Sequence, residues 1–135
     1  MNCQKVQVIC KIYSQSGEQI ARGVNTDPTG TCQKLGCLKI RKYGDDSSEH
    51  RNPADCNAIH AEIVALLKLA SVVHGHKYNT LSIWITRYPC EACIRAIIYF
   101  SRLYNVRFLL GYNDTDGKMS EQSQEMWDKY CGEVF

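Results

Sequence analysis

The sequence predicts an α/β fold, a three-layer α/β/α sandwich around a mixed sheet of about five strands. Three observations predict this fold class. The chain opens with two strand-like segments separated by a turn, its later part alternates strand-like and helix-like segments, and its 135 residues suit one hydrophobic core. Because strand, helix, strand, helix and strand follow the hairpin, the later strands should be parallel and joined by right-handed crossovers. We therefore expect residues 1–135 to form a single domain.

The first two strands are expected at residues 5–13 and 19–24. Apolar and polar residues alternate through most of the first segment, which is the period of a half-buried strand, and Ser16-Gly17-Glu18 forms a turn. Residues 25–30 are rich in turn formers, and no sustained period runs from there to about residue 57. A loop of this length in a small domain is usually functional or tied down.

The next segment, residues 58–74, is predicted to be a helix. Its apolar residues recur at the 3.6-residue period, and Asn57 suits the N-cap position. The opposite side of the helix is also apolar, with Ala61, Ala65 and Leu69. Because a helix that is apolar nearly all round is buried on both sides, we expect a sheet on one side and another surface, such as a second subunit, on the other.

The second half of the chain contains two further strands and two further helices. Residues 81–86 are rich in β-branched and aromatic residues and are predicted to be a strand. A helix is expected at residues 90–104, an apolar strand at 106–111, a loop at 112–118 and a closing helix at 120–131.

Composition and charge limit the classes of function. A hydrophobic share of 44% and a charged share of 22% are those of a folded globular chain, which excludes a disordered one. The formal net charge of +2 falls short of the basic excess that wrapping a nucleic acid requires, so no nucleic acid partner is expected. No segment has the apolar length of a signal peptide or a membrane span. We therefore expect a cytoplasmic protein without a membrane partner, whose eight cysteines favour metal binding over disulfides.

Two short motifs carry the chemistry. The first is His60-Ala61-Glu62 and the second is Pro89-Cys90-Glu91-Ala92-Cys93, with 26 residues between them. Together they form the H-x-E and P-C-x-x-C pattern, which is a known signature of zinc-dependent nucleobase deaminases. A catalytic zinc takes three ligands from the protein and keeps a fourth position for water, and one histidine with two cysteines provides those three ligands.

The spacing of these residues fits that chemistry. Cys90 and Cys93 lie at a helix start, so both sulfurs lie on one face of the first turn. The helix dipole and the unpaired N–H groups there favour the thiolate, which is the form that binds metal. His60 lies at another helix start, so two helix N-termini would converge on the ion. Glu62 can reach the open coordination position, where a proton shuttle is needed.

Each motif alone has a simpler interpretation. A lone Cys-x-x-Cys is commonly a structural zinc half-site or a redox pair, and a lone histidine at a helix start is commonly solvated. The two motifs together, with one helix and one strand between them, favour the catalytic interpretation.

On these residues the sequence resembles the cytidine/deoxycytidylate deaminase superfamily, and most closely its deoxycytidylate (dCMP) deaminase branch. The resemblance runs from about Lys5 to Asp114. Residues 21–30 look like the family's Gly-Tyr-Asn-Gly-x-Pro-x-Gly loop, and residues 85–90 look like its Val-Thr-x-x-Pro-Cys segment. The resemblance implies zinc-dependent hydrolytic deamination of a cytosine nucleotide, from dCMP to dUMP and ammonia.

Roles for three substrate-binding residues follow. The resemblance implies that Asn25 binds the sugar of the substrate, and we expect backbone groups of Ala61 to position the base. Arg87 is a candidate for meeting a phosphate, because it follows a strand end that must open onto the site. Other basic residues are weaker candidates, since exposed cations are usually solvated, and they are Lys34, Lys39, Arg41, Lys42 and Arg51.

A second group of cysteines lies in the long loop. Cys32, Cys37 and Cys56 look like the cysteine-bearing insert of the same branch, and His50 lies nearby. They are either small buried thiols or ligands of a closed structural zinc that pins the loop beside the site. The spacing of the remaining cysteines outside the motif is that of ordinary packing residues, and these are Cys3, Cys10 and Cys131.

The sequence departs from the family pattern in two places. Family members usually carry a helix before the first strand, which begins here almost at once, and Val64 stands where an asparagine is often found. A shorter chain loses one covering layer, so we expect a homo-oligomer.

The sequence leaves other functions open beside dCMP deamination. A free nucleoside, a free base such as guanine or an adenosine in tRNA could be deaminated by the same chemistry. A zinc-stabilised binding module without catalysis is an alternative from a different class. Glu62 argues against that module, because a purely structural site has no use for a carboxylate there.

Overall fold

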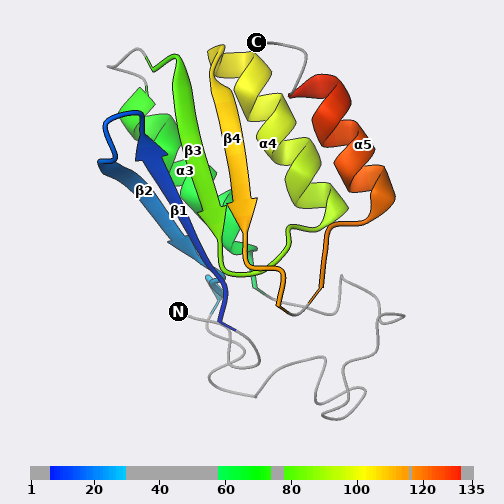
Figure 1. The fold of residues 1–135 in the computed structure, drawn as a ribbon. Helices are drawn as coiled ribbons and strands as arrows, with labels where there is room; N and C mark the ends of the chain where they lie inside the picture. Colours follow the sequence, from blue (N-terminus) through cyan, green and yellow to red (C-terminus); the bar gives the residue numbers. More distant parts are fainter. Residues whose placement is uncertain (1–6, 30–57, 74–77, 116, 132–135) are drawn as a thin grey trace.

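The structure, a computed structural model, describes residues 7–29, 58–73, 78–115 and 117–131. These residues form four strands and three helices in the predicted order (Figure 1). The elements are β1 (Ile9–Ser14), β2 (Gln19–Val24), α3 (Ala61–Val73), β3 (Thr80–Ile85), α4 (Glu91–Tyr104), β4 (Arg107–Tyr112) and α5 (Glu121–Tyr130). None of the helices in this part of the chain has the length and apolar character needed to cross a bilayer.

The strands form one mixed sheet in the order β2-β1-β3-β4. β1 pairs antiparallel with β2 and with β3, whereas β3 and β4 are parallel. The predicted α/β class and the mixed sheet are confirmed. The described residues contribute four strands to it, where about five were expected.

Alternation along the strands gives the sheet two different faces. Cys10, Ile12, Ile83 and Phe108 point to one face and are at most 2% exposed. On this face α3 and α4 pack with the strands into one hydrophobic cluster, and α5 packs against α4. In Figure 1, α3 lies behind the sheet. The core therefore lies between the sheet and its helices.

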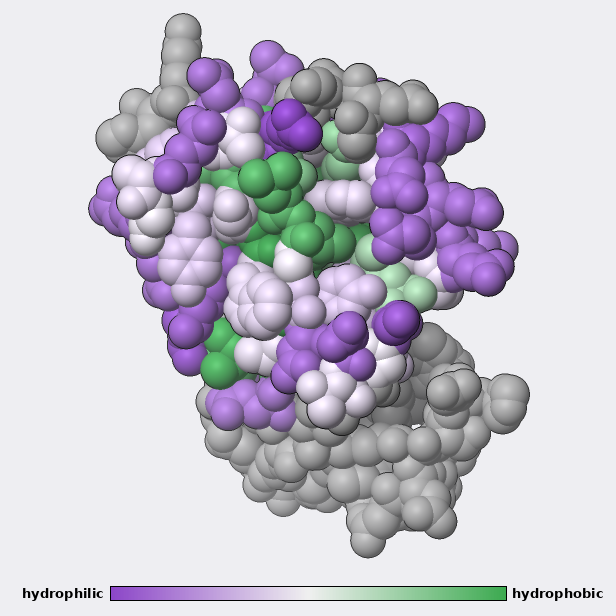
Figure 2. Space-filling view, viewed as in Figure 1, coloured by the Kyte–Doolittle hydropathy of each residue, from purple (hydrophilic) through white to green (hydrophobic). Residues whose placement is uncertain are grey.

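The opposite face of the sheet is not covered by any helix of the described residues. Trp84 and Leu109 point to it and are 45% and 50% exposed. The Trp84 ring lies over Gly111 of the neighbouring strand, where a β-carbon would come within 2.7 Å of the ring. Figure 2 views this face and shows hydrophobic side chains at its centre. Two of the three predicted layers are thus seen in the described residues.

Helix α3 starts three residues later than predicted. Ile59 forms an isolated antiparallel bridge with Thr26, in which its N–H donates to the Thr26 carbonyl at 2.7 Å and its carbonyl accepts the Thr26 N–H at 3.0 Å. Because the bridge commits Ile59 to extended backbone, the helix begins at Ala61. A bridge to a distant residue leaves no trace in the local period. Asn57, the expected N-cap, lies outside the described residues.

One edge of the sheet gathers the chain segments that carry the motifs. The carboxyl ends of β2, β3 and β4 lie at this edge, together with the amino ends of α3 and α4 (Figure 1). Loops at the carboxyl ends of strands and unpaired N–H groups at helix starts are where α/β folds bind ligands. This edge is therefore the place to look for a site.

Candidate active site

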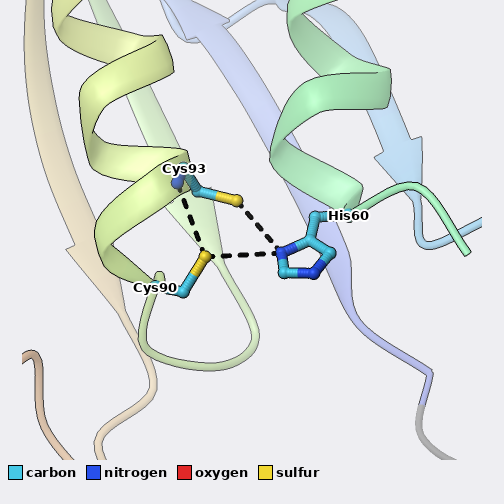
Figure 3. A group of neighbouring side chains, drawn as sticks. All are labelled: His60, Cys90 and Cys93. Carbon is cyan, nitrogen blue, oxygen red and sulfur yellow. Dashed lines mark hydrogen bonds between the residues drawn. The ribbon is translucent and has the colours of Figure 1, made fainter. Parts of the chain in front are cut away.

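Three side chains from two helix starts meet at this edge (Figure 3). His60 directly precedes α3, Cys90 directly precedes α4, and Cys93 lies in the first turn of α4. The His60 Nδ1 lies 3.2 Å from the Cys93 Sγ and 3.5 Å from the Cys90 Sγ. The three potential ligand atoms all lie within 4.8 Å of one another. The structure thus brings together the three residues predicted as zinc ligands.

The arrangement of these atoms fits a zinc ion. Tetrahedral zinc with Zn–S and Zn–N distances of about 2.3 and 2.0 Å keeps its nitrogen and sulfur ligands about 3.5 Å apart. The two observed nitrogen-to-sulfur distances, 3.2 and 3.5 Å, are close to that separation. His60 is exposed while Cys93 is buried, so the group is open to solvent on the histidine side. An open side is what a catalytic zinc needs for its fourth ligand.

Cys90 is both a candidate ligand and the N-cap of α4. Its Sγ accepts the Cys93 N–H at 3.4 Å. Hydrogen bonding with the Cys93 thiol, and then with His60 and that N–H, lowers the pKa of Cys90 to about 4 against the opposing effect of burial. The same thiol hydrogen bond, together with burial, raises the pKa of Cys93. Without metal the pair therefore holds one thiolate, at Cys90, and metal binding has to displace the Cys93 proton.

Glu62 lies in the first turn of α3 beside the three ligands and is 4% exposed. The His60 carbonyl accepts the first hydrogen bond of α3, from the Val64 N–H at 3.1 Å, so His60 and Glu62 are held by the same helical turn. Burial raises the pKa of Glu62, while hydrogen bonds with its own backbone N–H and with the Cys93 thiol, and attraction to His60, lower it. A buried carboxyl with a raised pKa next to a metal site is suited to proton transfer.

The predicted substrate-binding residues lie near the same edge. The Asn25 Oδ1, just after β2, accepts the Val8 N–H at 2.9 Å, and Ala61 is the first residue of α3 and is 1% exposed. The Arg87 guanidinium lies over the Tyr88 ring, with its carbon 5.0 Å from the ring centroid, and donates to the Tyr88 hydroxyl at 3.3 Å. These contacts restrict the Asn25 and Arg87 side chains.

The second cysteine group falls in a part of the chain that the structure does not describe. Cys32, Cys37, Cys56 and His50 all lie within residues 30–57. The structural zinc suggested for them therefore stays a prediction.

Two paired strand residues, Cys10 and Gly23, lie against the start of α3 and Glu62, which the sequence did not predict. Cys10 of β1 is fully buried, and its proximity to Glu62 adds to burial in raising the pKa of its thiol. Gly23 pairs with Cys10 across β1 and β2 and lies against the first turns of α3. Strand alternation predicts that Cys10 points inward, but it cannot show that the first turn of α3 lies over this pair.

Two solved structures of a phage enzyme share the fold of this chain. The dCMP deaminase of the cyanophage S-TIM5 in its apo form shares 20% sequence identity, with a TM-score of 0.55 over 93% of this chain and 79% of that chain. The same phage enzyme in complex with dCMP and dUMP gives 20% identity and a TM-score of 0.58, over 96% of this chain and 80% of that chain. Among curated proteins none matches this sequence.

A family model covers most of the sequence. The model of the cytidine and deoxycytidylate deaminase zinc-binding region matches residues 1–110, which include every residue of both motifs. The histidine and the two cysteines of those motifs are the side chains that meet at the sheet edge. The chain therefore belongs to the family of cytidine and deoxycytidylate deaminases.

Proposed function

We propose that this protein is a zinc-dependent hydrolytic deaminase that converts dCMP to dUMP and ammonia. The observation that carries the proposal is the meeting of His60, Cys90 and Cys93 beside the buried carboxyl of Glu62. Family membership supports deamination. The similar phage enzyme, whose structure holds dCMP and dUMP, supports a cytosine nucleotide as the substrate.

In this proposal the His60 Nδ1 and the two cysteine sulfurs hold the zinc ion. When bound, zinc lowers the pKa of a water molecule toward neutrality and so provides the hydroxide nucleophile. Cys90 offers a thiolate before the metal arrives, because its pKa is about 4. Cys93 loses its proton on binding, so metal uptake should release protons and weaken at low pH.

Glu62 is proposed to carry the protons of the reaction. Its carboxylate accepts a proton from the attacking water and donates it to N3 of the base as the water oxygen bonds to C4. It then transfers the remaining hydroxyl proton to the amino nitrogen as the C4–N bond breaks, which leaves uracil and ammonia. A single buried carboxyl beside the ligands can both accept and donate the proton, and in the metal-free protein burial already favours its protonated form by raising its pKa.

Three further residues are proposed to bind the substrate. Asn25 would hold the sugar, the Ala61 backbone would position the base, and Arg87 would bind the 5′-phosphate. The stacking of Arg87 on Tyr88 supports this role, because a guanidinium that is already ordered loses less conformational entropy when it binds a phosphate.

The role of Arg87 can be tested by comparing substrates with and without a phosphate. Arg87→Ala should raise KM for dCMP by about tenfold or more, because a hydrogen-bonded charge pair is lost. Deoxycytidine, which has no phosphate, should be turned over as by the unchanged protein. Tyr88→Phe is the matched control, since it keeps the ring under the guanidinium and removes only the hydroxyl acceptor. Equal losses on both substrates would contradict phosphate binding by Arg87.

The substrate is tested by measuring ammonia release from zinc-loaded protein. The panel is dCMP, cytidine, cytosine, guanine and a tRNA anticodon stem, and dCMP should give the highest kcat/KM. Faster ammonia release from another substrate of the panel would show that this substrate is preferred to dCMP, and zinc-dependent deamination would still be the reaction. No release from any of them by protein with zinc bound would instead favour a non-catalytic binding module.

A second, structural zinc at Cys32, Cys37, Cys56 and His50 is a separate proposal that rests on the sequence. Metal analysis of the purified protein should then give two zinc ions per chain. One zinc per chain would remove the second site and leave the first unaffected.

We also propose that the protein forms a homo-oligomer in the cytoplasm. Tyr99 and Leu103 lie one turn apart on α4 and are 68% and 61% exposed, and Leu67 of α3 is 64% exposed. Large apolar side chains next to one another on a surface, such as Tyr99 and Leu103, mark interaction sites. A reducing compartment would keep Cys90 and Cys93 available for metal. Sedimentation at micromolar concentration should show an oligomer, and a monomer under those conditions would contradict this proposal.

A further inference from the structure

Strand β2 approaches the start of α3 so closely that a side chain has no room between them. A β-carbon on Gly23 would come within 2.5 Å of the Ala65 nitrogen and 3.0 Å of its Cα, and nearer still to the Ala61 carbonyl oxygen. All three are backbone atoms of the helix. Rotating a side chain therefore cannot relieve the overlap, and any residue larger than glycine has to move the helix or the strand.

The two alanines on the helix side of this contact lie one turn apart. Ala61 is 1% exposed and Ala65 is fully buried. Their spacing puts two small side chains on the same face of α3, which lets the helix backbone approach the strand. Glycine on β2 and alanines on α3 together set the separation between the two elements.

A second tie holds the residue next to His60. The Thr26–Ile59 bridge has one hydrogen bond of 3.0 Å and one of 2.7 Å, and it lies three residues beyond Gly23 on the strand side. His60 lies between this bridge and the Gly23 contact. The end of β2 and the residues after it thus contact the chain on both sides of His60, at Ile59 and at Ala61.

The partners of His60 are held by other contacts. Cys90 and Cys93 belong to the start of α4, where Cys90 caps the helix and Ile94 N–H donates to the Cys90 carbonyl at 3.0 Å. A shift of α3 would therefore not be followed by an equal shift of the sulfurs. The His60 Nδ1 would leave its positions 3.2 and 3.5 Å from them.

We propose that Gly23 and the Thr26–Ile59 bridge are positioning elements of the metal centre, which fix the distance of His60 from the two cysteine sulfurs. This inference rests on the proposed function only in taking the three side chains as zinc ligands. Neither element supplies one of the three ligand atoms. Their effect is to hold the ligand set at the separation that a tetrahedral ion needs.

The test compares zinc-loaded Gly23→Ala with the unchanged protein and with Gly111→Ala. Gly111 lies in the same sheet, but its added β-carbon would meet only the Trp84 side chain, which is partly exposed and can move. Zinc affinity is measured by competition with a chelator, and cobalt is exchanged for zinc so that its absorption spectrum reports the ligand geometry. Both readouts are independent of turnover.

Gly23→Ala should bind zinc about 10- to 100-fold more weakly, as is usual when the support of a metal ligand is disturbed. Its cobalt spectrum should change, and kcat for dCMP at saturating zinc should fall more than KM rises. Gly111→Ala should keep the affinity and the spectrum of the unchanged protein. A folded Gly23→Ala with unchanged affinity and spectrum would overturn the proposal.

A second variant, Ile59→Pro, covers the case in which Gly23→Ala does not fold. It removes the N–H that donates to Thr26 and adds no side chain between β2 and α3. Weaker zinc binding with an altered cobalt spectrum supports the proposal, and unchanged values overturn it. If the unchanged protein deaminates none of the substrates but these variants still lose zinc, the positioning role stands and the proposed function fails.

Discussion

Helices α3 and α4 both begin at the candidate site, but different contacts hold their starts. The start of α4 is held from within, because Cys90 caps the helix through its own sulfur and Cys93 follows in the first turn. The start of α3 is held from outside, by Gly23 of β2 and by the bridge from Thr26 to Ile59.

This difference shows how the two halves of the metal centre are encoded. The cysteine half is a local motif whose ligands, cap and helix start belong to one short segment. The histidine half depends on a strand that lies far earlier in the sequence. Changes within the Cys-x-x-Cys segment should therefore act on metal and helix together, whereas changes in β2 should act on the metal centre through the placing of α3.

The largest expected effect comes from the cysteine half. Cys90→Ala and Cys90→Ser should both lose the bound zinc and all measurable deamination, because a thiolate ligand is removed. They should differ in the metal-free state, since serine can still accept the Cys93 N–H. Cys90→Ser should exceed Cys90→Ala by about 1 kcal/mol in free energy of unfolding. Metal analysis and denaturant unfolding check both, and equal stability of the two variants would remove the capping role.

A smaller effect is expected from the buried carboxyl of the histidine half. Because burial raises the pKa of Glu62, the folded metal-free protein keeps a proton that the unfolded chain releases above the usual value of 4.5. The contribution of Glu62 to the free energy of unfolding should therefore fall as the pH rises from 4.5 to the raised pKa and then level off, by about 1.4 kcal/mol for each unit of the shift. The lowered pKa of Cys90 acts in the opposite direction between about pH 4 and pH 9, so the Glu62 contribution is measured as a difference between two variants.

Glu62→Gln provides the comparison for this pH dependence. The metal-free variant should be more stable than the unchanged protein at pH 7, and the two should converge toward pH 4, where both side chains are neutral. Denaturant unfolding at a series of pH values measures the difference. A difference that grows toward acid pH would contradict a raised pKa for Glu62.

The smallest effect is expected at the far end of α4. Asn105 ends this helix in the left-handed region, at a φ of 53°. Asn105→Ala should cost about 1 kcal/mol of stability because alanine is strained there, and Asn105→Gly should be close to neutral. Both should bind zinc as the unchanged protein does, if the start of α4 is held by its own cap. A fall in zinc affinity with either change would contradict the claim that the start of α4 is held by its own cap.

Sequence patterns predicted the parts of the fold that local periodicity encodes. The bounds of β2 and the end of α4 agree with the expected ranges, and the residues of the two motifs meet as their spacing implied. The predicted start of α3 was wrong by three residues, because the bridge from Thr26 holds Ile59 in extended backbone. The role of Gly23 was missed for the same reason, since the atoms it faces belong to a helix distant in sequence.

The ionisation of the cysteine pair was predicted only in part. A helix start favours a thiolate, and the pKa of Cys90 is lowered as expected. The pKa of Cys93 is raised instead, because two sulfurs that share one hydrogen bond do not both ionise without a metal ion. That coupling depends on the distance between the side chains, which a motif does not specify.

The most direct test of the central claim is to measure bound zinc and dCMP turnover together in the unchanged protein and in Glu62→Gln. The unchanged protein should bind zinc and release ammonia from dCMP. Glu62→Gln should bind as much zinc and lose about 10²- to 10⁴-fold in kcat, because the proton carrier is gone while the three ligands remain. A Glu62→Gln protein with full zinc and undiminished turnover would contradict the account.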